Sequence, residues 1–245
     1  MELKGKAALV TGGSRGIGAA IAKALARAGA DVAITYVSAE DKAQAVVDEI
    51  RASGRRALAI RADSADMAEV EASVERAAGE FGRFDILVNN AGIAQMGPLE
   101  EVSVEDLDKT LSIHVRASFV ASQAAARRMG EGGRIVNIGS CLAERVAGPG
   151  MTLYAMSKSA LIGLSKGLAF DLGPRGITAN VVHPGPTDTD MNPAESEHAE
   201  GQRQKIALGH YGSAEDIAAT VVHLAGPGGR FITGASIAVD GGFAA

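Results

Sequence analysis

Short runs rich in β-branched and aliphatic residues alternate with longer helical patterns along all 245 residues of the chain. This alternation predicts strands joined by helical crossovers, and because such crossovers are right-handed, the strands form a parallel sheet with helices on both faces. The expected strands are 7–11, 31–36, 57–61, 86–89, 134–139, 177–182 and 236–239. The expected helices are 16–28, 40–53, 67–81, a long and bent 103–129, 154–172 and 213–225, the last opened by a capping box at Ser213.

The sequence shows no composition break, internal repeat or low-complexity tract. We therefore expect a single domain over residues 1–245, an α/β Rossmann-type doubly wound sheet of seven parallel strands. One irregular segment, 186–212, is too long for an ordinary connection. It follows the carboxyl end of a predicted strand, where such sheets bind ligands, so we expect a mobile lid over a substrate pocket. The alternative is a loosely ordered surface excursion.

Charge and cysteine content exclude several classes of protein. The 24 basic and 29 acidic residues are interspersed, and the formal net charge is −5. This balance argues against a nucleic-acid partner or an anionic membrane surface. Cys141 is the only cysteine, so no intrachain disulfide forms, which suits a reducing compartment. No segment has the apolar core of a signal peptide or the length of a membrane span, and we expect a cytoplasmic protein.

A glycine-rich turn lies between the first predicted strand and the first helix. Glycines let the backbone approach a pyrophosphate, and the helix N-terminus offers free N–H groups and a positive dipole. The spacing is G-x-x-x-G-x-G rather than the common G-x-G-x-x-G, so a tight structural turn is the alternative. We expect a dinucleotide to bind through the residues of this turn, Gly12, Ser14, Arg15, Gly16, Ile17 and Gly18.

The end of the second strand bears on which nicotinamide cofactor binds. NAD sites usually place an acidic residue there for the ribose 2′-hydroxyl. Here Tyr36 and Ser38 stand in that region, and Asp31 lies at the wrong end of the strand. Arg15 could reach a 2′-phosphate, which favours NADP(H), although Arg15 as a solvated loop residue is the alternative. Asp63 and Ser64 follow the third strand, where Asp63 is either an adenine acceptor or a turn cap.

Tyr154 and Lys158 stand four residues apart, and Ser140 lies fourteen residues upstream. On a helix, positions i and i+4 share a face, so a phenol lies beside an ammonium. The nearby cation lowers the pKa of the phenol toward the working pH, which makes Tyr154 a candidate proton donor. Ser140 offers a hydrogen-bond donor where negative charge develops. The alternatives are a packing tyrosine, a surface lysine and a serine that caps a strand end.

These motifs, in this order, resemble the short-chain dehydrogenase/reductase family over essentially the whole chain, in particular its 3-oxoacyl-acyl-carrier-protein reductase and carbonyl reductase branch. The resemblance implies that NADPH gives a hydride to a carbonyl carbon, Tyr154 protonates the oxygen, Ser140 fixes it, and Lys158 holds the nicotinamide ribose. It adds further cofactor-binding residues: Asn90, which tethers the backbone, Ala91, Gly92, Pro184, Gly185 and Thr187, with Thr189 as a weaker candidate for the contact of Thr187.

The family usually has an asparagine in the long helix where this chain has His114. In the family, this position supports a helix kink whose backbone carbonyl holds a water linked to the lysine. A histidine keeps that carbonyl and could add a group that titrates near pH 6–7. The alternative is a tolerated substitution without a proton role. The other histidines lack the spacing of metal ligands, and we expect no metal.

Three functions are consistent with these residues. The first is reduction of a small-molecule carbonyl or an acyl thioester by NADPH, for which Arg127 and Arg128 could dock a thioester carrier or simply be a solvated helix end. The second is an NAD(P)-dependent sugar, polyol or steroid alcohol dehydrogenase. The third is a non-catalytic NADP-binding sensor. Apolar surface on helix 154–172, together with the family resemblance, predicts a homotetramer, with a dimer as the alternative.

Overall fold

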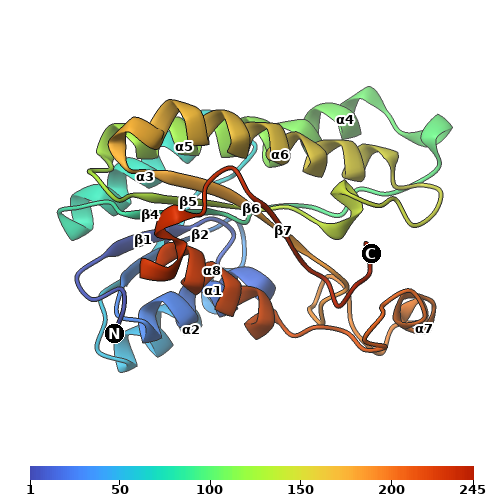
Figure 1. Ribbon diagram of the computed structural model, residues 1–245, viewed down its shortest axis with the longest axis horizontal. Coiled ribbons are helices and arrows are strands. Elements are labelled where there is room, and N and C mark those ends of the chain that lie inside the picture. The colour runs from blue at the N-terminus through green and yellow to red at the C-terminus, as the bar shows by residue number, and fades with distance from the viewer.

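Seven parallel strands form one sheet in the order β3-β2-β1-β4-β5-β6-β7, in a computed structural model that describes all 245 residues. The order runs outward in both directions from β1 and β4, so the sheet is doubly wound as predicted (Figure 1). The strands are β1 (Ala7–Val10), β2 (Asp31–Tyr36), β3 (Ala57–Arg61), β4 (Ile86–Asn89), β5 (Arg134–Ile138), β6 (Thr178–Pro184) and β7 (Ser236–Val239).

Helices cover both faces of the sheet (Figure 1). One face carries α1 (Gly16–Arg27), α2 (Glu40–Ala52) and α8 (Ala214–Ala225), and the other carries α3 (Met67–Phe81), α4 (Val104–Leu111), α5 (Ala117–Arg128) and α6 (Thr152–Leu172). A short helix, α7 (Ala199–Arg203), lies apart from both layers within segment 186–212. No helix combines the length and the apolar character needed to cross a membrane.

The core consists of two apolar clusters, one on each face of the sheet. Successive side chains of β1 alternate between them, because neighbouring residues of a strand point to opposite faces: Val10 joins the first cluster and Leu9 the second. All four residues of β1 are buried, which explains why the strand is a continuous apolar run in the sequence. The two clusters fix the central strands, and with them the loops at the carboxyl edge of the sheet.

The predicted long helix 103–129 is interrupted rather than continuous. A single π-helical turn, Ser112–Arg116, joins α4 to α5. Such turns insert one extra residue into the helical repeat and re-aim the side chains around it. The side chain of His114 lies in this turn and is almost fully buried. The bend expected from the sequence therefore has a defined position, at the residue where this chain departs from the family's asparagine.

The end of one strand differs from the predicted boundary in a way that concerns the site. β6 ends at Pro184 rather than at residue 182, because His183 and Pro184 still pair with Ala238 and Val239 of β7. In the sequence pattern, proline is a stop signal. Pro184 lacks only the backbone N–H, however, and it still pairs with the short edge strand β7. The capping box at the start of α8 is confirmed, with Ser213 and Asp216 bonded reciprocally.

Candidate active site

The candidate site residues lie at the carboxyl edge of the sheet, around the point where the strand order reverses. The glycine turn follows β1, and the segment Asn90–Gly92 follows β4. Ser140 lies just beyond β5, and Gly185 directly follows β6. Parallel strands all end at the same edge, so the topology gathers residues that are up to 170 positions apart. This edge is where open α/β sheets bind their ligands.

The glycine turn packs so closely that it excludes side chains. Gly12 and Gly16 have φ values of +64° and +52°, which L-residues with a side chain rarely adopt. A Cβ on Gly18 would lie 2.3 Å from the carbonyl oxygen of Gly12 and 2.4 Å from Nδ2 of Asn90. At the start of α1, Arg15 makes no side-chain cap, and the first turn holds no acidic residue. The free N–H groups of this helix end can therefore hold a phosphate.

Asn90 joins the glycine turn to the loop after β4. Its Nδ2 donates to the carbonyl oxygens of Thr11 and Gly12, at 2.9 and 3.0 Å. The hydroxyl of Thr11 in turn accepts from the backbone N–H groups of Asn90 and Ala91, at 2.9 and 3.0 Å. These four bonds make Asn90 the tether that the sequence suggested, and they hold Ala91 and Gly92 beside the glycines.

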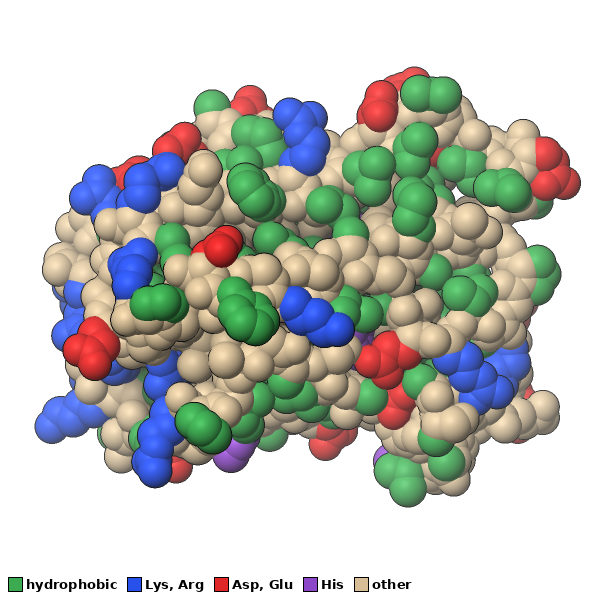
Figure 2. Space-filling view, turned by 45° about the horizontal axis from the view of Figure 1, so that its top comes forward, with side chains coloured by type: hydrophobic (Ala, Val, Ile, Leu, Met, Phe, Trp, Pro, Cys, Tyr) green, Lys and Arg blue, Asp and Glu red, His purple; other side chains and the backbone are tan.

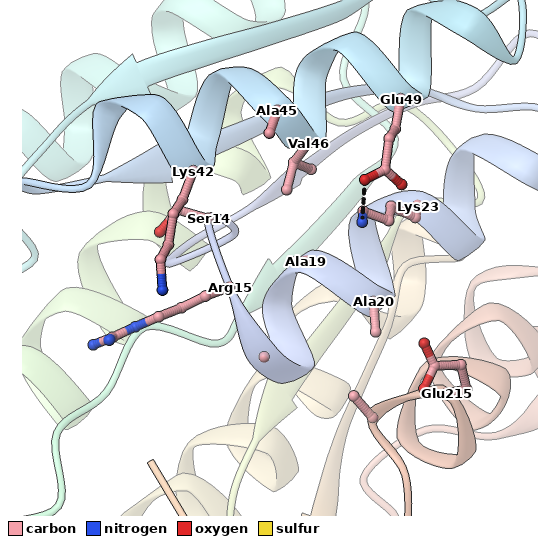
Figure 3. A pocket seen from close by; sticks show the side chains of 12 residues that line it. Ser14, Arg15, Ala19, Ala20, Lys23, Lys42, Ala45, Val46, Glu49 and Glu215 are labelled. Atoms are coloured by element: carbon pink, nitrogen blue, oxygen red, sulfur yellow. Dashed lines mark hydrogen bonds and ion pairs between the residues drawn. The ribbon is translucent and has the colours of Figure 1, made fainter. Parts of the chain in front are cut away.

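The end of β2 offers no carboxylate to a ribose. Tyr36 is nearly buried, Ser38 is exposed, and Asp31 lies at the far end of the strand. A cavity of about 350 Å³ opens beside the glycine turn between α1, α2 and the start of α8, and Arg15 and Lys42 extend toward the same side of it (Figure 3). The cavity lies away from Tyr154, so we assign it no substrate. Its basic mouth suits a phosphate.

Two further positions near the adenine end differ in their contacts. Oδ1 of Asp63 accepts from the backbone N–H of Ala65 at 2.8 Å, so the carboxylate already caps a turn. Ser64 is buried beside it. Of the two alternatives for Asp63, the structure favours the turn cap, and an adenine contact would have to use the second carboxylate oxygen.

Ser140, Tyr154 and Lys158 come together at the end of β5. Ser140 and Lys158 are buried, and Tyr154 is partly exposed. The ammonium of Lys158 donates to the carbonyl oxygen of Ile138 at 3.0 Å and lies 5.8 Å from the centre of the Tyr154 ring. The hydroxyl oxygen of Ser140 accepts from the backbone N–H of Leu142 at 3.2 Å. The helical spacing thus places phenol and ammonium side by side, as predicted.

Burial controls the protonation of this group. It raises the pKa of Tyr154 to about 12, with the neighbouring Ser140 hydroxyl opposing the shift. It lowers the pKa of Lys158 to about 8. The pKa of Tyr154 is therefore raised, not lowered as the sequence led us to expect, because desolvation of the phenolate is the largest cause of its shift. The phenol stays protonated at neutral pH, which is the form that a proton donor needs.

A family model described as enoyl-(acyl carrier protein) reductase matches residues 12–244. The crystal structure of a short-chain dehydrogenase from Burkholderia cenocepacia J2315, in complex with NADP, is 61% identical, with a TM-score of 0.99 and full coverage of both chains. The protein belongs to the short-chain dehydrogenase/reductase family. It is thus an oxidoreductase by family.

Two curated relatives carry different names. The cyclic-di-GMP-binding biofilm dispersal mediator protein of Escherichia coli (strain K12) is 45% identical over 241 residues, with 98% of each chain covered. The 3-oxoacyl-[acyl-carrier-protein] reductase FabG of Staphylococcus aureus (strain Mu50 / ATCC 700699) is 40% identical over 240 residues, with 97% of each chain covered. Close relatives of this short-chain dehydrogenase/reductase therefore bear both an enzyme's name and a ligand-binding protein's name.

His114, which replaces the family's asparagine, is a structural link in this short-chain dehydrogenase/reductase. Its Nε2 accepts from the backbone N–H of Ile93 at 2.9 Å, so the ring proton is on Nδ1, 2.8 Å from Oγ of Ser157. Ser157 donates onward to the carbonyl oxygen of Tyr154 at 2.7 Å. The carbonyl oxygen of His114 itself accepts from Ser118 at 2.7 Å and keeps a second lone pair. The imidazole thus joins three segments of the site.

The suggestion that His114 titrates near pH 6–7 is wrong. Burial, reinforced by the charge of Lys158, lowers the pKa of the imidazole from 6.5 to about 3. A neutral ring is also what its hydrogen bonds require, because one nitrogen must accept from Ile93. His114 therefore holds the backbone of the catalytic helix α6 without exchanging a proton at physiological pH.

Two threonines in the loop after β6 lie in different surroundings. Thr187 is buried, and its hydroxyl donates to the carbonyl oxygen of Gly185 at 2.9 Å. Thr189 lies against the glycine turn, with its methyl 3.4 Å from where a Cβ on Gly16 would stand. Pro184 and Gly185 close against the C-terminal turn, where a Cβ on Gly185 would meet Asp240. Thr189 therefore lies beside the glycine turn, and the contact of Thr187 with a nicotinamide carboxamide stays a prediction.

A small apolar cluster adjoins Tyr154 on the other side. It combines the segment after Ser140, the end of segment 186–212 and the C-terminal turn, through Leu142, Ile206 and Phe243. Lys205 donates to the carbonyl oxygen of Ala147 at 3.0 Å and joins two of these segments. Side chains from three loops therefore surround the position next to the phenol.

Arg127 and Arg128 are not free cations. Arg127 pairs with Glu71, and Arg128 pairs with Glu75, both on the adjacent α3. Both lie half-exposed on the last turn of α5, as the solvated helix end expected from the sequence, and they also tie α5 to α3. A thioester carrier would therefore have to displace two ion pairs to dock on them.

Sequence reasoning missed several polar residues that hold the site. Ser157 was overlooked because a serine inside a helix pattern has no distinctive spacing. His183 was dismissed only as a metal ligand, yet it contacts the backbone of Ser140 at 3.1 Å. Asp190, in the loop after β6, forms an ion pair at 2.8 Å with Lys42 on α2. Two polar residues in otherwise apolar strand patterns were the available signals. They are His183 near the end of the buried strand β6 and Ser236 at the start of β7.

Proposed function

We propose that this protein reduces a carbonyl to an alcohol with NADPH as the hydride source. The observation that supports this most is the convergence of Ser140, Tyr154 and Lys158 beside a glycine turn at one edge of the sheet. The solved relative from Burkholderia cenocepacia, crystallised with NADP, supports the choice of cofactor. When bound, the nicotinamide supplies the hydride.

The residues present fit NADP(H). The glycine turn forms a cradle that a Cβ at Gly18 would fill, and the N-terminus of α1 has free N–H groups for the pyrophosphate. Arg15 and Lys42 flank the cavity mouth and would face a 2′-phosphate, although Asp190 holds Lys42 in an ion pair, and Glu49 and Glu215 also line the cavity. Lys158 would hold the nicotinamide ribose, as the family resemblance implies.

Each site residue has a role in this proposal. The protonated phenol of Tyr154 gives its proton to the oxygen of the carbonyl as negative charge develops there. The raised pKa does not prevent this transfer, because an alkoxide is a far stronger base than a phenolate. Ser140 donates a hydrogen bond to the same oxygen, and Lys158 favours the phenolate left behind. A fresh proton must then reach Tyr154 before the next turnover.

The substrate class follows from what surrounds Tyr154. Leu142, Ile206 and Phe243 form an apolar wall, which suits a ketone or 3-oxoacyl group with a short aliphatic chain. The pairing of Arg127 and Arg128 with glutamates weakens the case for a carrier protein. We favour free ketones and small thioesters as substrates, and segment 186–212 as the lid that closes over them.

The test is NADPH consumption by the purified protein with short 3-oxoacyl thioesters and a panel of ketones, with Tyr154→Phe as the paired variant. Turnover that depends on Tyr154 supports a reductase. Saturable NADPH binding without turnover of any carbonyl, in both the thioester and the ketone series, would contradict it.

We further propose that the protein assembles as a homotetramer. The face that comes forward in Figure 2, over α4, α5 and α6, carries scattered apolar side chains. On α5 and α6 these include Phe119, Met156 and Phe170, which are 52%, 46% and 87% exposed. Exposed apolar groups mark an interaction surface where they form one patch, and these three lie on the neighbouring helices α5 and α6. Light scattering that gives the mass of one chain at micromolar concentration would contradict assembly.

A second candidate is binding of cyclic-di-GMP, favoured by the 45% identity to the E. coli protein named for it. The cavity beside the glycine turn, with Arg15 and Lys42 at its mouth, would suit a phosphodiester. Titration calorimetry with cyclic-di-GMP, with and without saturating NADPH, separates the two functions. Binding that NADPH abolishes would place both ligands in one cleft, and no binding would leave the reductase alone.

A further inference from the structure

His183 is the second-last residue of β6 and lies fully buried beside the backbone that carries Ser140. The ladder between β5 and β6 extends to the N–H of Gly139, which donates to Val182 at 2.7 Å. The next amide, that of Ser140, donates to Nδ1 of His183 at 3.1 Å. A Cβ on Gly139 would lie 2.4 Å from the same nitrogen, so the ring fills the space next to this backbone. An imidazole thus takes the place of a strand partner for Ser140.

The other ring nitrogen continues the chain of hydrogen bonds. Nε2 of His183 lies 2.8 Å from Oγ of Ser236 on β7, and that hydroxyl donates to Oε1 of Glu144 at 2.8 Å. Because Nδ1 accepts from an amide, the proton of the neutral ring must be on Nε2 and be donated to Ser236. The single hydrogen of Ser236 then goes to the carboxylate. Every donor has one acceptor, so the chain has one direction.

Both ends of this chain return to the same short loop. Ser140 caps the 3-10 turn Cys141–Ala143, and Glu144 follows the turn directly. The imidazole and the Ser236 hydroxyl therefore fasten the loop to β6 and β7 at its beginning and its end. We call His183, Ser236 and Glu144 the loop clamp. The hydroxyl of Ser140 can point in a defined direction only if this backbone is fixed.

Burial, rather than the surrounding charges, favours the neutral ring of His183. Burial lowers its pKa, and Lys158 acts in the same direction, whereas Glu144 and Asp240 oppose them. A protonated ring would direct an N–H at the N–H of Ser140, so two donors would face each other. The clamp therefore depends on the one tautomer that its partners select.

We propose that His183 is a positioning residue for Ser140, held in its Nε2–H tautomer by Ser236 and Glu144 so that the serine hydroxyl meets the substrate oxygen. The effect on reaction rate rests on the proposed reductase function. The clamp itself is a property of the fold and can be tested without a substrate.

Amide hydrogen exchange over residues 140–144 tests the clamp directly. We expect faster exchange in His183→Ala and Ser236→Ala, and recovery in His183→Asn, whose side-chain oxygen can accept from Ser140, and in Ser236→Thr, which keeps the hydroxyl. His223→Ala, at an exposed histidine on α8, is the matched control and should exchange like the wild type. The serine pair decides the question if His183→Ala does not fold.

Kinetics with NADPH and a reducible carbonyl test the positioning role. We expect kcat to fall about 10- to 100-fold in His183→Ala and less in Ser236→Ala, because misplacement of a catalytic group by about 1 Å has effects of this size. The Kd for NADPH and the KM for the carbonyl should stay near the wild-type values. Histidine ¹⁵N spectra should show the Nε2–H tautomer in the wild type, and the Nε2 shift should change in Ser236→Ala, where that N–H loses its acceptor, but not in Ser236→Thr.

Unchanged loop exchange in both His183→Ala and Ser236→Ala, or the Nδ1–H tautomer in the wild type, would overturn the proposal. A clamp that behaves as expected in a wild-type protein without turnover would support the positioning of the loop and count against the reductase alone.

Discussion

The glycine turn and the Tyr154 end of the candidate site are built by opposite means. At the glycine turn, the site exists because side chains are missing: a Cβ at Gly18 would lie 2.3 Å from the carbonyl oxygen of Gly12. At the tyrosine end, buried polar side chains build the site, and His114 alone joins Ile93 to Ser157. The first end is fixed by backbone geometry, and the second by hydrogen bonds in a desolvated setting. They should therefore respond differently to substitution.

Apart from the loss of Tyr154 itself, the largest effect is expected at the tyrosine end, from Ser140→Ala. Loss of a preorganised donor to the substrate oxygen should lower kcat about 10²- to 10³-fold, while the Kd for NADPH stays unchanged. Single-turnover kinetics and a fluorescence titration of NADPH measure the two quantities. Ser140→Thr keeps a hydroxyl and is the control. If Ser140→Ala kept the wild-type kcat, the serine would have no part in the chemistry.

His114→Asn should change how stability depends on pH. The folded imidazole has a pKa of about 3 against 6.5 in the unfolded chain, so the unfolded state binds more protons as the pH falls below about 6.5. This part of the stability is complete above that pH, and roughly 3 kcal/mol of it should be lost between pH 7 and pH 4. Asparagine does not titrate, so the variant should lack this loss.

Urea unfolding of both proteins at several pH values measures the difference. The acid limb of the pH–rate profile near pH 6–7 should not move in His114→Asn, since the ring stays neutral there. A limb that moved with the substitution would restore a proton role for His114 and contradict the buried, neutral ring.

A substitution in the glycine turn should act through steric clash. Gly18→Ala forces a methyl against a carbonyl oxygen and against Nδ2 of Asn90, so we expect about 1–3 kcal/mol of lost stability and weaker NADPH binding. Gly79→Ala is the matched control, because its Cβ in α3 would meet nothing within 4 Å and should stabilise the helix slightly. Thermal unfolding with and without NADPH separates the two effects. Equal behaviour of the two variants would show that the turn has room.

The smallest effect concerns discrimination between cofactors. Arg15→Ala should weaken NADPH binding about tenfold and leave NADH binding nearly unchanged, because only the 2′-phosphate distinguishes the two. Parallel titrations with both cofactors give the ratio, and Arg27→Ala on the last turn of α1 serves as a control for the loss of one positive charge. An equal loss for both cofactors would assign Arg15 to the pyrophosphate instead.

The same contrast explains what could be predicted from the sequence. Strand and helix order, the glycine turn and the Tyr154–Lys158 pair follow from periodicity and spacing, which are local properties of the chain. The raised pKa of Tyr154 and the neutral His114 depend on how much water the fold removes, which no spacing encodes. The partners of His183 lie more than 35 positions away on other strands and loops, so only the folded sheet brings them together.

The central claim is that Tyr154 is the proton donor of a carbonyl reduction driven by NADPH. The most direct measurement compares wild type and Tyr154→Phe for NADPH affinity and for NADPH oxidation in the presence of a ketone or a 3-oxoacyl thioester. We predict equal affinity and a loss of turnover of about 10²- to 10⁴-fold in the variant, the range for removal of a general acid. Turnover that survives in Tyr154→Phe would contradict the account.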